Sequence, residues 1–147
     1  MADLIELFTR ASKLMRGAAD AAYSRHGVRV GQNLVLELLW EEDGLAPGEI
    51  ARRLGISTPT VVKMAGRMQA TGLLTRQRDE RDARLVRLYL TERGRSLRTA
   101  ILDERRRLAE RATARLSAQE RRRLESALAT MIANLEASTP DPASDRR

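Results

Sequence analysis

The chain has 147 residues, 42% of them hydrophobic, and a formal net charge of +7 from 27 basic and 20 acidic residues. This length suits one ordinary domain with its own core, and the positive charge suits a polyanionic partner, above all nucleic acid. The absence of cysteine excludes disulfides, thiolate metal sites and thiol redox sensing, and the single histidine argues against a histidine metal centre. We therefore expect no cofactor and no metal.

The sequence also lacks the features of a membrane or exported protein and those of an enzyme. No uninterrupted apolar run approaches the ~20 residues that a membrane span needs, and the first residues lack the basic and apolar regions of a signal peptide. We therefore expect a cytoplasmic protein without a membrane partner. An enzyme is not expected either, because the chain has no glycine-rich phosphate loop and no carboxylate pair in a recognisable cleft setting.

Helical periodicity covers the first third of the chain. Apolar residues recur at intervals of three and four over residues 4–23, which predicts an amphipathic helix. A second helix is predicted over residues 30–41 and a third over residues 47–54. Pro47 suits the first position of the third helix because its missing N–H costs nothing there, and Gly55 suits the position just past the end.

A fourth helix is predicted over residues 57–71, with Ser57 as its N-cap. After this helix the periodicity changes from helical to alternating. Residues 74–78 and 86–90 are predicted to form the two strands of a hairpin, and residues 79–84 its polar tip.

Two more helices are predicted after the hairpin. Thr91 is expected to cap a long helix whose apolar residues continue to Leu116. Ser117 and Glu120 have the spacing of a capping box, in which each side chain satisfies the other residue's backbone N–H at the start of a helix. Residues 140–147, beyond this last helix, are expected to form a disordered tail.

The third and fourth predicted helices, joined by a tight turn at Gly55, have the form of a helix-turn-helix. The fourth helix is expected to bury one face, made of Val61, Met64, Ala65 and Met68. Thr60, Lys63 and Arg67 then point outward and offer the hydroxyl, ammonium and guanidinium donors that contact base edges and phosphates in a major groove. An ordinary solvated helix face would look the same in isolation, but an arginine-rich hairpin follows at once and favours DNA binding.

The hairpin carries four arginines within nine residues, Arg76, Arg78, Arg81 and Arg84. A slender loop that bears arginine can enter a minor groove, whose negative potential attracts it. Asp82 is expected to hold Arg84 in position through a charge-assisted hydrogen bond. A hairpin laced with salt bridges and without any partner is the alternative interpretation.

At this point the chain resembles a known family: residues 49–94 look like the MarR family, the multiple-antibiotic-resistance type of bacterial regulators. The matching residues are Glu49-Ile50-Ala51, Leu54-Gly55-Ile56-Ser57, Thr60-Val61, Arg67-Met68, Gly72-Leu73-Leu74-Thr75-Arg76, Asp82-Ala83-Arg84 and Leu90-Thr91-Glu92-Arg93-Gly94. The order of the other helices extends the resemblance, more weakly, to nearly the full length.

The resemblance implies a mainly α-helical fold with a small β-wing, the winged helix-turn-helix. The DNA-binding lobe would be residues 30–91, and the dimerisation helices would be residues 3–28 and 92–137. All of these would belong to a single domain over residues 1–139.

Family members are typically homodimers on double-stranded operator DNA, and many are repressors that small phenolic or other hydrophobic ligands release. The resemblance therefore implies a homodimeric, sequence-specific repressor released by a small hydrophobic or aromatic effector. The implied DNA contacts are Ser57, Thr58, Thr60, Lys63 and Arg67 on the recognition helix and Arg76, Arg81, Asp82 and Arg84 on the wing. A ligand pocket would lie near Leu36 and Trp40, although a core position suits Trp40 better.

Two residues depart from the family pattern. Gly66 stands where members usually have an acid that in some of them pairs with the wing arginine, and glycine costs a helix about 1 kcal/mol relative to alanine. Ala46 stands where a Ser or Thr cap is usual, which costs about 1 kcal/mol more.

Two other functions stay open at this point, a basic architectural or RNA-binding protein that does not read sequence and a partner-binding module without DNA affinity. Sequence specificity at fixed salt separates the first of these from a regulator, because binding to the backbone alone shows none.

Overall fold

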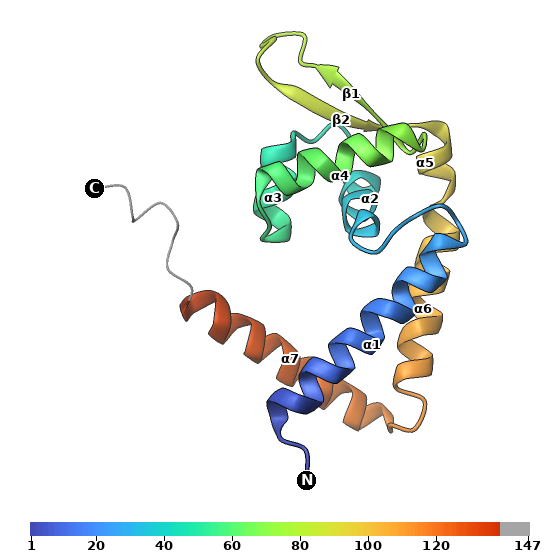
Figure 1. Ribbon diagram of the computed structural model, residues 1–147, viewed down its shortest axis with the longest axis vertical. Coiled ribbons are helices and arrows are strands. Elements are labelled where there is room, and N and C mark those ends of the chain that lie inside the picture. Colours follow the sequence, from blue (N-terminus) through green and yellow to red (C-terminus); the bar gives the residue numbers. More distant parts are fainter. Residues whose placement is uncertain (139–147) are drawn as a thin grey trace. The chain divides into compact units, whose positions relative to one another are not determined.

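The computed structural model describes residues 1–138, so the expected tail at residues 140–147 lies outside the described residues. These residues are mainly helical, with one antiparallel two-stranded sheet, which confirms the predicted fold class (Figure 1). The elements in chain order are α1 (Leu4–Ser24), α2 (Gln32–Glu41), α3 (Pro47–Leu54), α4 (Thr58–Ala70), β1 (Leu74–Arg78), β2 (Val86–Leu90), α5 (Glu92–Ser96), α6 (Arg98–Ala112) and α7 (Ala118–Ser138). No helix among them is both long enough and apolar enough to cross a bilayer.

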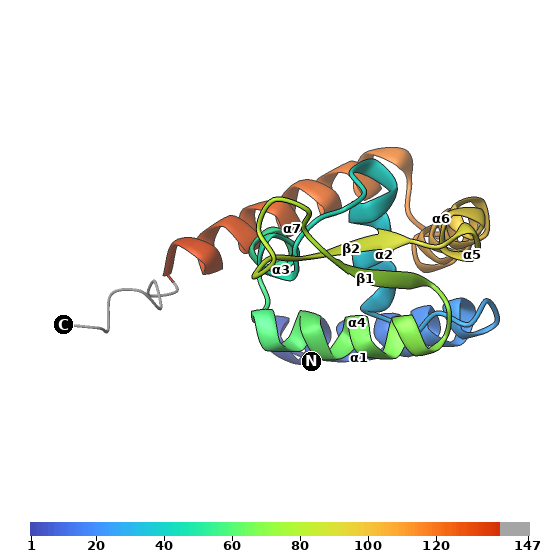
Figure 2. The same ribbon diagram turned by 90° about the horizontal axis from the view of Figure 1, so that it is seen from above.

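The chain divides into two compact units, residues 1–109 and the residues from 110 onward. The first unit holds a single apolar core to which α1 to α4, both strands and α6 contribute. Its largest fully buried side chains are Val28, Val35, Leu36, Leu39, Ile50, Val61, Met68, Leu73, Leu74, Leu88 and Ile101. Within this unit α1 and α4 lie along the same side, as the view from above shows (Figure 2).

Sequence periodicity placed most element boundaries correctly. The predicted third helix and both strands have the observed bounds, and the strands pair from Leu74 opposite Leu90 to Arg78 opposite Val86. The capping box is also confirmed, because the backbone N–H of Ser117 donates to Glu120 at 2.7 Å and that of Glu120 donates to Ser117 at 3.1 Å.

The second helix begins at Gln32, two residues later than predicted. The carboxylate of Asp20 on α1 accepts hydrogen bonds from the Arg29 side chain and from the backbone N–H of Val30. These bonds hold residues 29 and 30 against α1 in a non-helical conformation. Gly31, with φ +96°, then turns the chain into α2.

The prediction of a single long helix after the hairpin is wrong in two respects. Thr91 does cap it, but the helix is interrupted at Leu97, which separates α5 from α6. The hydroxyl of Ser96 and the backbone N–H of Leu97 both donate to the carbonyl of Arg93, at 2.8 and 3.2 Å. The helix then ends at Ala112, so Leu116 lies in the turn before α7 instead of in the helix.

Two close contacts connect α5 and α6 with the rest of the first unit. At Gly94 on α5 a side chain is excluded, because an added Cβ would lie 2.1 Å from the carbonyl oxygen of Leu73. Farther along, the Glu104 carboxylate on α6, only 9% exposed, meets Arg25 at 3.0 Å and His26 at 3.2 Å. The hydrogen bond from His26, followed by that from Arg25, lowers the pKa of Glu104 from its ordinary value despite the opposing effect of burial.

Candidate nucleic-acid interface

Helices α3 and α4 are joined by the tight turn that the sequence predicted. Gly55 adopts φ +66°, the left-handed conformation that glycine tolerates best, and ends α3. Ser57 then caps α4: its side-chain oxygen accepts the backbone N–H of Thr60 at 3.3 Å and lies 2.7 Å from the Thr60 hydroxyl. The turn and the cap together set the direction in which α4 leaves α3.

One face of α4 is buried and the other is open to solvent. Val61, Ala65 and Met68 are at most 1% exposed. Met64 is half-buried at the edge of the core, so its predicted core position is only partly correct. The predicted DNA-contacting residues of this segment, Ser57, Thr58, Thr60, Lys63 and Arg67, are all exposed.

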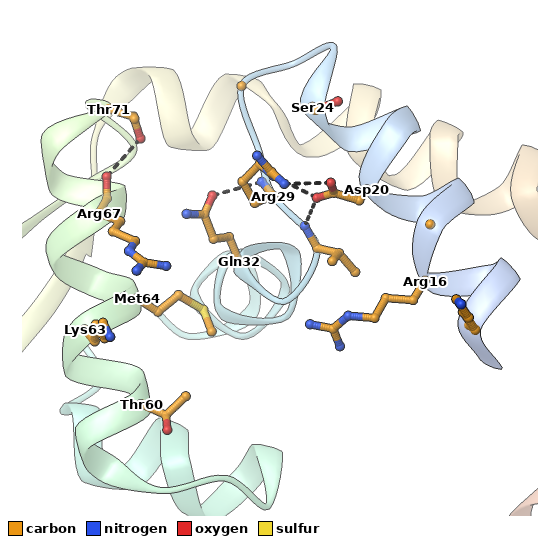
Figure 3. A pocket seen from close by; sticks show the side chains of 14 residues that line it. Arg16, Asp20, Ser24, Arg29, Gln32, Thr60, Lys63, Met64, Arg67 and Thr71 are labelled. Atoms are coloured by element: carbon orange, nitrogen blue, oxygen red, sulfur yellow. Dashed lines mark hydrogen bonds and ion pairs between the residues drawn. The ribbon is translucent and has the colours of Figure 1, made fainter. Parts of the chain in front are cut away.

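An open groove with a volume of about 1160 Å³ lies between α1 and α4. We call it the α1–α4 groove; its charged lining residues are Lys13, Arg16, Asp20, Arg29, Lys63 and Arg67. Figure 3 shows Arg16 reaching into it from α1 and Arg67 pointing toward it from α4. Thr60 also lines it, so the structure brings three predicted contact residues, Thr60, Lys63 and Arg67, together on one surface.

The hairpin of β1 and β2 forms the predicted wing, seen at the top of Figure 1. Strand β2 also forms a short bridge with Leu45, because the backbone N–H of Leu88 donates to the Leu45 carbonyl at 2.9 Å. Arg76, Arg81, Asp82 and Arg84, the predicted wing contacts, are all exposed. The wing therefore presents its arginines on a hairpin anchored at its base by a third segment.

The tip of the wing is organised by Asp79, which sequence reasoning missed. One Asp79 carboxylate oxygen accepts the backbone N–H groups of Arg81 and Asp82 at 2.8 and 2.9 Å, and the other accepts Nε of Arg87 at 2.6 Å. Arg87 also donates to the Gly44 carbonyl at 3.0 Å. The hydrogen bond from Arg87 is the main reason that the pKa of Asp79 falls to about 2. An aspartate directly after a strand is a frequent turn former, and this was the available signal.

The predicted pair of Asp82 and Arg84 is present but weak. The Arg84 backbone N–H donates to Asp82 at 3.1 Å, whereas the guanidinium Nε lies 3.5 Å from the same oxygen. The Arg84 side chain is 95% exposed. Asp82 therefore shapes the backbone of the tip more than it restrains the guanidinium group.

The two residues predicted near a ligand pocket lie in different surroundings. Leu36 is fully buried in the core. Trp40 is half-buried, and its indole N–H donates to the Gly94 carbonyl at 2.9 Å. Trp40 borders a hollow of about 290 Å³ whose other lining residues are Leu39, Asp43, Leu90, Arg95 and Arg98.

Both departures from the family pattern are visible in the structure. Ala46 precedes α3 without any side-chain cap. Gly66 is exposed on α4, and a Cβ added there would meet nothing within 4 Å. No packing requirement therefore explains glycine at position 66.

We expect Asp79→Ala to loosen the tip of the wing and Asp82→Ala to change it little. The first change removes two backbone hydrogen bonds and the bond to Arg87, whereas the second removes one backbone bond and the long contact with Arg84. Trypsin cleavage after Arg81 and Arg84 measures the difference, and cleavage should be faster in Asp79→Ala. Equal rates for the two variants would contradict this role of Asp79.

The pH dependence of amide exchange at the wing tip of the unsubstituted protein provides a second test of the Asp79 contacts. The pKa of Asp79 is about 2 in the folded protein and 3.8 ordinarily. The stabilisation that its carboxylate gives to the wing tip is therefore complete above about pH 4 and is lost as the pH falls through about 2. The protection of the amides of residues 81 and 82, measured against the intrinsic exchange rate at each pH, should therefore persist down to about pH 4 and fall below it. In Asp79→Ala this transition should be missing.

A family model described as "MarR family" matches residues 26–85. Among curated proteins, the HTH-type transcriptional regulator TtmR of Methylorubrum extorquens (strain PA1) is 40% identical over 75 residues, which are 51% of this chain and 38% of TtmR. The organic hydroperoxide resistance transcriptional regulator of Bacillus subtilis (strain 168) is 34% identical over 104 residues, 71% of this chain and 69% of that protein. The chain thus spans well under half of the first relative and about two thirds of the second.

The fold is also found among solved structures. The S. aureus MepR–DNA complex matches with a TM-score of 0.83 and 24% identity over 91% of this chain and 99% of that one. At this sequence identity the structural match shows the fold alone. The sequence match to the Bacillus regulator, which covers about two thirds of both chains, agrees with that fold. The chain belongs to the MarR family of winged helix-turn-helix transcriptional regulators.

Proposed function

We propose that this protein is a homodimeric, sequence-specific DNA-binding regulator that acts as a repressor and is released by a small-molecule effector. The observation that carries the proposal is the exposed face of α4, with Thr60, Lys63 and Arg67, in the same unit as a wing of exposed arginines. Support also comes from MepR, a protein of the same fold that was solved as a DNA complex.

In this proposal α4 enters a major groove and the wing reaches the neighbouring minor groove. The start of α4 at Thr58 suits a phosphate, because the positive end of the helix dipole lies there. Pro59 has no N–H and that of Thr60 already donates to Ser57, so the Thr58 hydroxyl and the dipole would provide the attraction. Lys63 and Arg67 form no ion pair with any carboxylate among residues 1–138, so both are available for base edges or phosphates. Arg76, Arg81 and Arg84 serve the minor groove, whose negative potential attracts exposed guanidinium groups.

We expect Arg84→Ala and Lys63→Ala to weaken DNA binding in different ways. Loss of Arg84 removes a positive charge that contacts the DNA backbone or minor groove. Affinity should therefore fall on all duplexes, and the slope of log affinity against log salt concentration should become shallower by about one unit. Loss of Lys63 removes a base contact, which costs about 1–3 kcal/mol on the preferred duplex and changes the preference. Fluorescence anisotropy with operator and scrambled duplexes over a salt series measures both.

Arg122→Ala, at an exposed arginine on α7, is the matched control for lost charge and should bind as the unsubstituted protein does. If Arg84→Ala leaves affinity and salt dependence unchanged, the wing is not a DNA element. If every duplex binds equally at fixed salt, the alternative of a sequence-independent architectural protein replaces the proposal.

The proposed dimer rests on apolar side chains that the single chain leaves exposed. On α1, Leu4, Ile5, Leu7, Phe8, Leu14 and Met15 are all at least 43% exposed. No residue of α7 is buried within the described part of the chain, and Leu124, Ile132 and Leu135 are 42–66% exposed. Apolar surface of this extent is characteristic of an interaction site, and a second copy would remove it from water.

We therefore expect sedimentation equilibrium to give twice the 16.5 kDa mass of one chain. Phe8→Glu should shift the equilibrium toward monomer, because it places a charge in the apolar face. Thr9→Glu, at an exposed neighbour on the polar side of the same helix, is the control and should remain dimeric. A stable monomer in the unsubstituted protein would refute this part of the proposal.

The effector part of the proposal concerns the hollow beside Trp40. The Trp40 ring and the guanidinium groups of Arg95 and Arg98 are the kinds of group that a small aromatic carboxylate requires. In the free protein Arg95 donates to the Leu90 carbonyl and Arg98 pairs with Glu41, so a ligand would share or replace these contacts. Leu36 lies in the core and would meet a ligand only if the core opened. One relative is named for organic hydroperoxide resistance, but a thiol cannot serve as the sensor here because these 147 residues contain no cysteine.

We expect a small aromatic acid to release bound DNA and mild peroxide to leave it bound. A ligand shifts the equilibrium only if it binds the DNA-competent and incompetent arrangements with different affinity. The measurement is a titration of the DNA complex with each compound in turn, with Trp40→Leu as the variant that should lose the response. Reversible release by peroxide would overturn the exclusion of oxidant sensing.

A further inference from the structure

We propose that the DNA interface extends onto α1, where Lys13 and Arg16 bind the sugar–phosphate backbone of the strand that runs along the α1–α4 groove. This inference rests on the proposed DNA-binding function and adds a surface that lies outside the helix-turn-helix and the wing. Lys13 and Arg16 on α1 line the same groove as Lys63 and Arg67 on α4, and Figure 3 shows Arg16 across the groove from α4.

The lining of the groove is strongly positive. It contains five cationic side chains and a single carboxylate, Asp20. That carboxylate is already occupied: Arg29 donates to it twice at 2.9 Å, and the backbone N–H of Val30 donates at 3.0 Å. These hydrogen bonds, above all those from Arg29, lower the pKa of Asp20, so Asp20 stays ionised and its charge is balanced by Arg29.

Within residues 1–138 the other four cations form no hydrogen-bonded pair of this kind, although the charge of Arg16 also contributes to the lowered pKa of Asp20. Lys13, Arg16, Lys63 and Arg67 form no ion pair with a carboxylate among the residues that the structure describes. Four like charges around one groove repel one another, and a cleft lined by one sign of charge concentrates the opposite sign. The groove therefore suits an anion that residues 1–138 do not supply.

The length of the groove favours a polyanion. Thr60 and Thr71 both line the groove, and at 1.5 Å per residue they lie about 16 Å apart along α4. A DNA strand carries one phosphate for about every 3.4 Å of helix axis, so several phosphates can lie along this length. A small anion would engage only part of it.

The position of the groove beside α4 identifies the polyanion as the DNA that α4 reads. A major groove about 12 Å wide is largely filled by one helix with its side chains, so a phosphate strand lies directly on each side of that helix. On one side of α4 lies α1, and the cations of α1 face this strand. Lys13 and Arg16 thus increase the affinity for DNA and help to orient the protein on the duplex without reading bases.

The proposed dimer leaves this surface open. The apolar stripe of α1 includes Leu4, Phe8, Ala11, Met15 and Ala18. At 3.6 residues per turn, the stripe that contains Lys13, Arg16 and Asp20 is centred about 150° away around the helix. A second copy that packs on Leu4, Phe8 and Met15 therefore approaches α1 from a side largely opposite to Lys13 and Arg16.

Gly17 allows a test that removes no native contact. It lines the groove on α1, and a Cβ added there would meet nothing within 4 Å. Both Gly17→Glu and Gly17→Gln should fold, because glycine is the poorer helix former. The two side chains have the same shape and differ in charge, so only Gly17→Glu should repel a phosphate strand.

The experiment measures anisotropy of a fluorescent operator duplex over a salt series for Lys13→Ala, Arg16→Ala, Arg16→Lys, Gly17→Glu and Gly17→Gln. Each lost cation should make the salt dependence shallower by about 0.9 and lower affinity by about five-fold at 0.15 M salt, equally on operator and scrambled duplexes. Arg16→Lys keeps the charge and should keep the salt dependence. Gly17→Glu should bind more weakly than Gly17→Gln, and sedimentation should show every variant to be dimeric.

The outcomes separate this inference from the function on which it rests. If the unsubstituted protein binds no duplex, the proposed function fails. If it binds the operator while Lys13→Ala, Arg16→Ala and Gly17→Glu bind equally well with unchanged salt dependence, the extension onto α1 is wrong and the function stands. If those variants keep DNA affinity but lose release by benzoate, the groove is an effector site and the extension is again wrong.

Discussion

The orientation of α4 depends on the burial of three side chains, and the rest of the proposed interface depends on that orientation. Val61, Ala65 and Met68 are almost completely removed from water, and α4 contacts α3 and β1. Burial of such side chains contributes about 1.5–3 kcal/mol for each large one, so rotation of α4 about its axis would be costly. Because the helix cannot rotate, Thr60, Lys63 and Arg67 are held on the outside.

Three carboxylates connect separate segments of this protein, and an arginine partly neutralises each of them. Asp20 holds the segment before α2, Asp79 holds the tip of the wing, and Glu104 connects α6 with the end of α1. Each of these acids accepts a hydrogen bond from an arginine side chain. Exposed cations without such a carboxylate within residues 1–138, Lys63, Arg67 and Arg76 among them, are found on the proposed DNA-facing surfaces.

Local sequence was sufficient for the elements whose signals are themselves local. The capping box at Ser117, the cap at Ser57, the glycine that ends α3 and the alternation of the strands each depend on residues within a few positions of one another. These elements were predicted with nearly correct bounds. The start of α2 was predicted two residues early because its cause, Asp20, lies on another helix.

By itself the sequence determined the helix-turn-helix, the wing and the outward face of α4, because helical and strand periods assign each side chain to a face before any tertiary contact exists. Only the tertiary structure decided which charged groups meet. The pairing of Asp79 with Arg87 across the hairpin depends on how the chain folds back. The same holds for the groove that places Lys13 and Arg16 opposite Lys63 and Arg67. Residues some fifty positions apart share no local pattern, and the packing of α1 and α4 around one core brings their side chains to the same surface.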